Sequence, residues 1–115
     1  SEISGIKVVL HDLKNHPNDL KILGDQFRMQ QKTSGVIVLI SSIEDKMNVM
    51  CAVTDDLLSS ISAGDIAQKI GKKIDGGGGG KKHLATAGGK NIIKGSEILD
   101  FASSYIESSI SSGNK

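Results

Sequence analysis

The chain is 115 residues long, 37% of its residues are hydrophobic, and its 14 basic and 13 acidic residues leave a net charge of +1. This length supports one domain with a single core, and no apolar run is long enough for a transmembrane helix. With no Trp, one Tyr and two Phe, the chain lacks the aromatic platforms that stack single-stranded nucleic acid.

Two features of the sequence bear on its cellular context. The single cysteine, Cys51, excludes an internal disulfide and fits a reducing compartment. Because no signal peptide opens the chain either, the sequence predicts the cytoplasm. The first residue is Ser1 rather than Met, so we expect the chain to be a segment of a longer protein. Cys51 has apolar neighbours, and we interpret it as a core thiol.

The first half of the chain predicts a strand, a helix and a second strand. Residues 6–10 form a short apolar stretch. A helix then starts with Pro17 as its first residue and continues to about Lys32, because apolar side chains recur there at helical spacing. Residues 36–40 are continuously apolar and β-branched, which is typical of a strand buried on both faces. A strand, a helix and a strand in this order predict a right-handed parallel crossover.

A hairpin follows in the prediction. Residues 44–46 turn the chain and residues 47–53 return as the second arm, which makes the sheet mixed. Asp55 and Asp56 then stand together at the end of this strand. A turn or a cap accounts for them better than a catalytic carboxylate pair, because acidic residues are favoured in turns and Leu57 and Leu58 follow directly.

The second half predicts two helices. Residues 62–73 form the first, with Ser62 as its cap and Asp65 three residues later in a capping-box arrangement. The last helix is predicted to be capped by Ser96. The fold class is therefore α/β: a single domain over residues 1–110, with a small mixed sheet, packed helices and a glycine-rich loop, followed by a disordered tail at 111–115.

Residues 75–91 read DGGGGGKKHLATAGGKN and form the most informative segment. Five consecutive glycines can reach positive φ and present bare N–H groups, so we expect a loop that meets an anion. Leu84, Ala85 and Ala87 predict a short helical turn after it. The Rossmann fingerprint fails because the glycines follow a helix. The Walker A motif fails because Lys82 stands where Ser or Thr is required.

Charge in this region is strongly uneven. Between Lys69 and Lys94 there are seven lysines and one acid, Asp75, which gives this window a net charge of +6 and the remaining residues −5. Clustered lysines beside a glycine-rich loop favour a polyanion backbone over a small ligand with one phosphate. A solvated lysine-rich surface remains the alternative, and the composition does not decide between the two.

The segment GGGKKHLATAGG, residues 78–89, resembles the glycine-rich signature of the C-terminal domain of alanyl-tRNA synthetases, a DHH-associated domain. That signature runs as three glycines, Arg-Pro-Asp, an apolar residue, Ala, any residue and Ala-Gly-Gly. The three glycines match residues 78–80 and the apolar position matches Leu84. Lys81, Lys82 and His83 replace Arg-Pro-Asp, so positive charge is kept while the proline and the acid are lost. The resemblance covers about residues 5–110.

The resemblance implies a non-catalytic domain that contacts the outer corner of tRNA and helps link aminoacylation with editing. The parent chain would then be an alanine–tRNA ligase, and the isolated chain would catalyse no reaction. The implied nucleic-acid-binding residues are glycines, lysines and one histidine around the signature. They are Lys72, Lys73, Gly78, Gly79, Gly80, Lys81, Lys82, His83, Gly88, Gly89 and Lys90.

Partners implied by the resemblance are tRNA, which is alanine tRNA in the parent enzyme, and the remaining domains of the parent chain. It leaves room for homo-oligomers formed through upstream regions, and no membrane contact is expected. Two alternatives stay open at this point. The domain could be the substrate-binding half of a DHH-type phosphoesterase that acts on short oligonucleotides or cyclic dinucleotides, or it could be a plain assembly module.

No metal or other cofactor is expected. His11 and His16 flank Asp12, but a zinc site would need a further ligand nearby, and surface or capping histidines explain them better. His83 lies beside the basic segment. It is interpreted equally well as a solvated residue and as a partner for phosphate or ribose.

Overall fold

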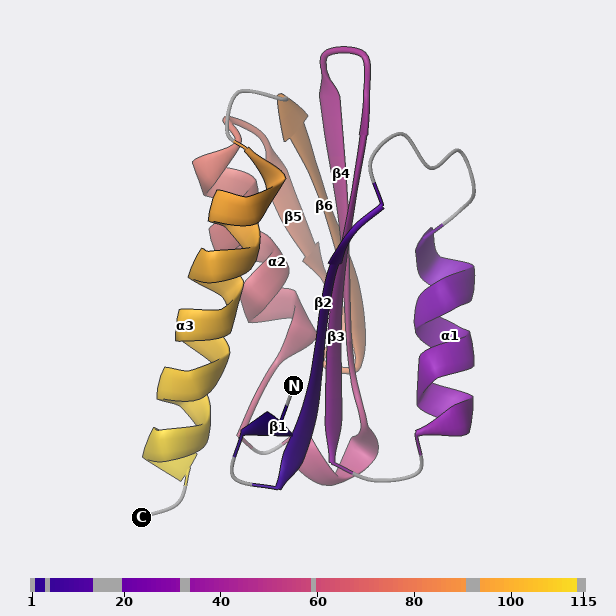
Figure 1. Ribbon diagram of the computed structural model, residues 1–115, viewed down its shortest axis with the longest axis vertical. Coiled ribbons are helices and arrows are strands. Elements are labelled where there is room, and N and C mark those ends of the chain that lie inside the picture. The colour runs from indigo at the N-terminus through magenta and orange to yellow at the C-terminus, as the bar shows by residue number, and fades with distance from the viewer. Residues whose placement is uncertain are drawn as a thin grey trace.

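The computed structural model describes residues 2–3, 5–13, 20–31, 34–58, 60–90 and 94–113, and for residues 2, 3, 21 and 111–113 it describes the backbone alone. Its centre is a six-stranded sheet with the strand order β1-β2-β3-β4-β6-β5 (Figure 1). The strands are β1 (Glu2–Ile3), β2 (Ile6–Asp12), β3 (Gly35–Ile43), β4 (Lys46–Val53), β5 (Gly77–Gly80) and β6 (Leu84–Lys90). The helices are α1 (Leu20–Gln30), α2 (Ala63–Lys73) and α3 (Gly95–Gly113), with a short 3-10 turn η1 (Asp55–Leu57).

Strand pairing confirms the mixed sheet. β2 and β3 run parallel, with Lys7 opposite Gly35 and Asp12 opposite Ile40. All other neighbours are antiparallel. Helix α1 lies between β2 and β3 in the chain, as a parallel crossover requires. The predicted start of this helix at Pro17 falls outside the described residues.

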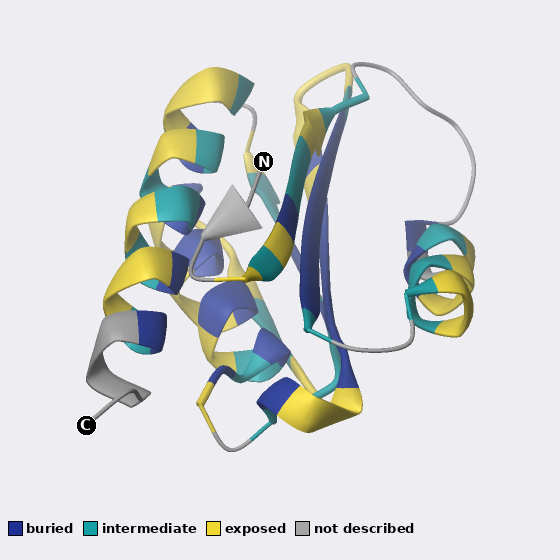
Figure 2. Cartoon of the chain, turned by 60° about the horizontal axis from the view of Figure 1, so that its bottom comes forward, coloured by how far each residue is buried: buried dark blue, intermediate teal, exposed yellow. Residues whose placement is uncertain are grey.

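The sheet is covered by helices on both faces (Figure 1). Helices α2 and α3 pack on one face over the larger core cluster, and α1 packs on the other over a smaller cluster. β3 and β4 lie between these layers, and Figure 2 shows them as the most continuously buried part of the sheet. Val38 is fully buried, and its neighbours Ile37 and Leu39 are 7% and 5% exposed. The prediction of a strand buried on both faces is therefore confirmed.

Residues with positive φ make the connections at both ends of β3. Ser34 has a φ of 57° and turns the chain into β3. Its backbone N–H and its hydroxyl both donate to Asp56, at 2.8 Å and 2.7 Å. Glu44 turns the hairpin with a φ of 55°, and Ile43 pairs with Lys46 across it. Asp56 thus acts in a turn, as expected.

Helix α2 begins as predicted. Ser62 is its N-cap, and its hydroxyl oxygen accepts a hydrogen bond from the Asp65 N–H at 3.3 Å. Ile66, Ile70 and Ile74 are fully buried along one side of this helix, which is the amphipathic pattern of a helix packed on a sheet.

The start of α3 corrects the predicted cap. Helix α3 begins one residue before Ser96, because the N–H groups of Glu97 and Ile98 donate to the Lys94 carbonyl oxygen. Lys94 therefore holds the capping position, and Ser96 lies inside the first turn. The helix continues to Gly113, into the stretch 111–115 where a disordered tail was expected. Residues 114 and 115 lie outside the description.

The glycine-rich segment differs most from expectation. The glycines form strand β5 and not a loop, and Leu84, Ala85 and Ala87 belong to strand β6 and not to a helical turn. β6 pairs with β4 along its whole length, for example Ala85 with Cys51. Ala85 and Ala87 alternate onto the α2 side, where both are buried. Pairing with a strand edge that would otherwise be open outweighs the weak helical pattern of so short a segment.

A glycine-rich candidate nucleic-acid interface

Strand β5 is composed of glycine because helix α2 lies directly against it. A Cβ atom on Gly78 would lie 2.3 Å from the carbonyl oxygen of Ala67 on the helix. A Cβ on Gly71, within the helix, would lie 2.6 Å from the carbonyl carbon of Gly77. Both distances are below van der Waals contact, so only glycine lets the two backbones approach this closely. Several glycines of the signature are therefore structural.

The turn between β5 and β6 is fixed by backbone hydrogen bonds to three elements. The Lys81 N–H donates to the Leu84 carbonyl oxygen at 3.0 Å and closes the hairpin. The Ala63 N–H at the start of α2 donates to the Lys82 carbonyl oxygen at 2.8 Å, and the Val53 N–H of β4 donates to that of His83 at 3.0 Å. The side chains of Lys81 and Lys82 are exposed while their backbone is held. This turn therefore presents two positive charges from a fixed position.

A shallow hollow lies beside this turn. Its volume is about 310 Å³. Its lining consists of glycine backbone and of side chains from the turn and β6: Gly79, Gly80, Lys81, His83, Leu84, Ala85 and Thr86. Lys81 and His83 provide hydrogen-bond donors there. The hollow brings together four of the predicted site residues, Gly79, Gly80, Lys81 and His83, and is suited to an anionic or planar group.

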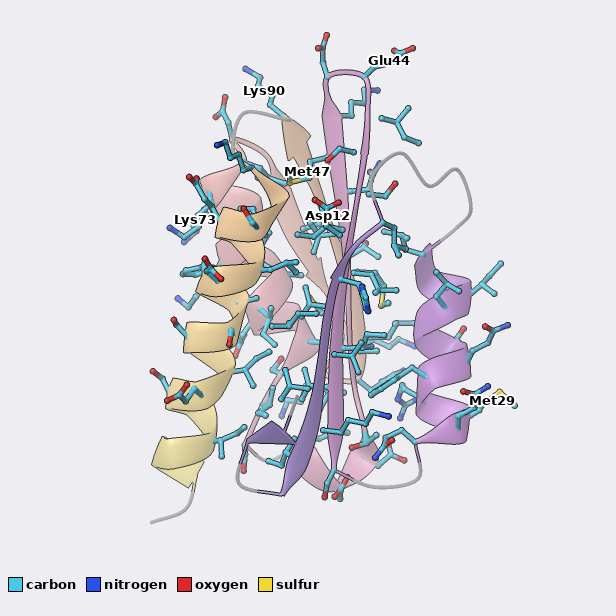
Figure 3. The ribbon with its side chains drawn as sticks, viewed as in Figure 1. Asp12, Met29, Glu44, Met47, Lys73 and Lys90 are labelled. Atoms are coloured by element: carbon cyan, nitrogen blue, oxygen red, sulfur yellow. The ribbon has the colours of Figure 1, made fainter. Side chains whose placement is uncertain are left out.

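The remaining predicted lysines lie at the other end of the hairpin. Lys90 ends β6, and its ammonium group is 3.0 Å from the carboxylate of Asp75. Lys72 and Lys73 end helix α2, and the Lys73 ammonium lies 4.4 Å from the centroid of the Phe101 ring. Figure 3 shows Lys73 and Lys90 toward the same end of the sheet as Glu44. The lysines therefore form two groups, separated by the length of β6.

Strand geometry gives the size of this separation. β6 has seven residues, which at about 3.3 Å per residue span roughly 20 Å. The expectation of one lysine cluster around a glycine loop is thus replaced by two groups of lysines, one at each end of the hairpin.

Sequence reasoning missed one lysine of the group at the Lys90 end. Lys46 stands opposite Lys90 in the β4–β6 register, and the hairpin prediction alone did not reveal this pairing.

Gly88 and Gly89 have different surroundings although they are adjacent. A Cβ on Gly89 would lie 2.4 Å from the carbonyl oxygen of Ile74, which also accepts a hydrogen bond from the Lys90 N–H at 2.7 Å. A Cβ on Gly88 would meet its nearest atom, Oδ1 of Asn48, at 3.7 Å, an ordinary contact distance. Gly89 is therefore required by packing, and Gly88 is not.

Other candidate groups serve the structure. Cys51 is fully buried, and burial raises the pKa of its thiol to about 12. The Ser34 N–H, followed by the Thr54 hydroxyl, lowers the pKa of Asp56 below 3.8. Asp55 forms an ion pair with Arg28. Together these contacts explain the acidic pair as a structural tie between η1, α1 and the start of β3.

The described residues contain no group of three or more His, Cys, Asp or Glu side chains placed to hold a metal ion. His11 is exposed on β2, and His16 lies outside the described residues. Within the same described ranges, no helix combines the length and apolarity needed to cross a membrane.

Comparison with known proteins identifies clear relatives. A family model described as the DHHA1 domain matches residues 5–108. The alanine–tRNA ligase of Alkaliphilus oremlandii is 42% identical over 100 residues, which are 85% of this chain and 11% of the relative. The alanine–tRNA ligase of Pseudothermotoga lettingae is 34% identical over 102 residues, or 89% of this chain and 12% of the relative. The chain thus spans about a tenth of the length of these relatives.

A solved structure has the same fold. The crystal structure of the C-Ala domain from Aquifex aeolicus alanyl-tRNA synthetase superimposes with a TM-score of 0.82 at 25% sequence identity. The match covers 93% of this chain and 96% of that domain. The two chains therefore share one fold over nearly their full lengths.

Proposed function

The chain belongs to the DHHA1 domain family, as a C-terminal domain of the alanyl-tRNA synthetase type, and from this we propose that it binds the phosphate backbone of tRNA. The observation that carries the proposal is the placement of exposed lysines at both ends of one hydrogen-bonded hairpin. Lysines that neutralise phosphates release condensed counterions, which gives affinity without base recognition. Binding is therefore expected to be nearly indifferent to the identity of the tRNA.

The parent chain in this proposal is an alanine–tRNA ligase of the cytoplasm. The domain supplies no chemistry of its own and holds tRNA for the remaining domains of that chain, which helps link aminoacylation with editing. The alanine–tRNA ligases found as relatives support this function. No observation on the described residues favours the phosphoesterase alternative.

The proposal is tested with Lys81→Ala/Lys82→Ala at the fixed turn. This double variant is expected to remain folded, because both side chains are exposed and the turn is held by backbone hydrogen bonds. Its tRNA affinity should fall. The slope of log K against log salt should flatten by about 0.9 for each phosphate contact that is lost on a duplex backbone. A salt titration of tRNA binding measures both effects.

A matched control separates the hairpin from general surface charge. Lys7 is exposed on β2, and the strand order places β2 three strands away from β6. Lys7→Ala removes one charge, as Lys81→Ala does, and should leave both affinity and salt slope close to those of the wild type. Equal losses from these two single variants, or wild-type binding by the double variant, would contradict the proposed interface.

A further inference from the structure

The residue that follows helix α2 is an aspartate in a place that favours glycine. Ile74 is the C-cap of α2, and the Gly76 N–H donates to the Gly71 carbonyl oxygen at 2.9 Å, which is the hydrogen bond that defines a Schellman motif. Asp75 lies between Ile74 and Gly76 and has a φ of 54°. Glycine is the usual residue at this left-handed position, and asparagine also occurs there. The backbone conformation alone therefore does not explain an aspartate.

The charge of Asp75 is also unfavourable at the end of a helix. Lys72 and Lys73 in the last turn of α2 complement the negative end of the helix dipole. A carboxylate directly after that turn meets the same free carbonyl groups and is repelled by them. Two local preferences, one of conformation and one of charge, are therefore violated at one residue, and such violations are expected where a residue serves function.

The contact that Asp75 makes does not explain its presence through stability. Its carboxylate lies 3.0 Å from the Lys90 ammonium group, and the two side chains are 67% and 66% exposed. Exposed ion pairs contribute little to the free energy of unfolding, because water screens them and two long side chains must be held in place. The two segments are joined without this pair, since the Lys90 N–H donates to the Ile74 carbonyl oxygen at 2.7 Å. The pair therefore changes chiefly the charge that Lys90 presents to solvent.

Asp75 is placed where a negative charge has the largest effect on anion binding. It is the only acidic residue between Lys69 and Lys94, a window that contains seven lysines. Its partner Lys90 stands opposite Lys46 in the β4–β6 register, in the group of lysines at the far end of the hairpin. A phosphate that approaches Lys90 therefore meets a carboxylate that already neutralises this lysine.

We propose that Asp75 limits the affinity of this domain for RNA: its carboxylate occupies Lys90 in the free chain, and an RNA phosphate has to displace it. This inference rests on the proposed tRNA binding and adds to it a residue that opposes binding. The exposed pair is weak, so a phosphate of an RNA already held at Lys81 and Lys82 can replace the carboxylate, because its effective concentration at Lys90 is high. The acid thus lowers the affinity and speeds the release of bound RNA.

The experiment removes the charge of Asp75 and keeps its shape. Asp75→Asn places asparagine at a left-handed position that it accepts and relieves the repulsion at the helix end, so the thermal midpoint should stay equal or rise. The dissociation constant for tRNA should fall about two- to fivefold, the effect of losing one exposed ion pair that competes with binding. The slope of log K against log salt should steepen by up to about 0.9, because Lys90 then neutralises a phosphate with its full charge.

A double-mutant cycle tests whether Asp75 acts through Lys90. Lys90→Ala should weaken tRNA binding only slightly in the wild-type background, because the ion pair already neutralises this lysine. In the Asp75→Asn background the same substitution should weaken binding more, since the two residues are in contact and their effects are not additive. The gain in affinity from Asp75→Asn should accordingly disappear when Lys90 is alanine. An undiminished gain would show that Asp75 acts through the general charge of the surface, and the inference would be overturned.

Asp25→Asn is the matched control, because it changes the net charge by the same amount. Asp25 is exposed on α1, which covers the other face of the sheet (Figure 1), and this variant should bind tRNA as the wild type does. If Asp75→Asn binds tRNA no more tightly than Asp25→Asn, the inference fails while the proposed function stands. A lower thermal midpoint of Asp75→Asn would assign the acid to the stability of the fold and overturn the inference too. Absence of tRNA binding by the wild-type chain would remove the proposed function and the inference together.

Discussion

At the scale of single residues, two side chains have protonation states that burial and hydrogen bonding determine. Cys51 lies on the central strand β4 with no exposed surface, and desolvation raises the pKa of its thiol to about 12. Because the thiolate is the reactive form, this cysteine is inert for two reasons at once, its protonation and its inaccessibility.

Cys51 should therefore report on global unfolding. We expect a thiol-specific reagent such as 5,5′-dithiobis(2-nitrobenzoate) at pH 8 to leave the folded chain unlabelled. In denaturant, one equivalent should react, because the exposed thiol regains its ordinary pKa near 8.5. Rapid stoichiometric labelling of the native chain would contradict the burial of β4.

Asp56 illustrates the opposite effect. Its carboxylate accepts hydrogen bonds from the Ser34 N–H and hydroxyl and from the Thr54 hydroxyl, the last at 2.7 Å. These bonds favour the charged form, so the pKa lies below its ordinary value of 3.8. They also hold Ser34 in its left-handed conformation at the entrance to β3. The residue therefore links one loop to the central strand.

Asp56→Asn should destabilise the chain in a pH-dependent way. A lowered folded-state pKa means that the stabilising contribution is complete well above pH 3.8. It is lost as the pH falls through the folded-state value. The thermal midpoint of wild type should exceed that of Asp56→Asn at pH 7, and the difference should shrink below about pH 3.8. Thermal melts at several pH values measure this, and a difference that grows in acid would refute the assignment.

At the scale of elements, β5 shows how packing overrides propensity. Four consecutive glycines are unfavourable in a strand, because glycine is conformationally free and has no side chain to pack. The strand forms because α2 supplies a backbone surface that only glycine can approach, at Gly78 above all. Local sequence does not contain this information, so a loop was the natural prediction.

Adjacent glycines should respond to the same substitution with opposite signs. Gly78→Ala drives a methyl group into the Ala67 carbonyl and should lower the free energy of unfolding by about 1–3 kcal/mol. Gly77→Ala meets open space and should be neutral or raise it by up to about 1 kcal/mol. Urea denaturation of both variants makes the comparison. Equal destabilisation by the two would show that α2 does not contact β5 as described.

The separation of the lysines has a similar origin. A compact loop would have gathered Lys81 and Lys90, which are close in sequence, around one ligand. An extended strand instead places them roughly 20 Å apart, since each residue advances the chain by about 3.3 Å. The candidate site residues remain a prediction from the glycine and lysine pattern. Their division into two ends depends on the conformation of β6, which the short apolar pattern left undecided.

At the scale of the whole molecule, the fold follows from patterns that the sequence states clearly. The apolar run at residues 36–40, the hairpin and the cap at Ser62 each indicate their element without tertiary information. The order of the strands does not follow in the same way. β6 lies between β4 and β5. It pairs with the edge of β4 that would otherwise be unpaired, and its small side chains leave room for α2 to pack on it. Long-range pairing of this kind is invisible to local periodicity.

The centre of the sheet should not tolerate a charge. Val38 is fully buried. It pairs with Leu10 on β2 on one side and with Cys51 on β4 on the other. Val38→Asp would bury a carboxylate without a partner, at a cost of several kcal/mol, out of a total stability of about 5–15 kcal/mol for such a domain. We expect the variant to be unfolded by circular dichroism.

Ile43 provides the matched control on the same strand. It is 38% exposed at the end of β3, so Ile43→Asp should remain folded with a small change in thermal midpoint. A cooperative, unshifted thermal transition for Val38→Asp would place β3 at the surface and refute the layered architecture.

The position of β5 at the margin of the sheet has a consequence for how these molecules behave together at high concentration. An edge strand offers unpaired backbone groups on which another chain can add, and this is a common origin of fibrils. Growth of that kind also needs interlocking side chains and segments poor in glycine, and β5 is glycine throughout. The same glycines that let α2 approach the backbone of β5 therefore make this border a poor template for self-assembly. We therefore expect this edge of the sheet to resist growth by strand addition even at high protein concentration.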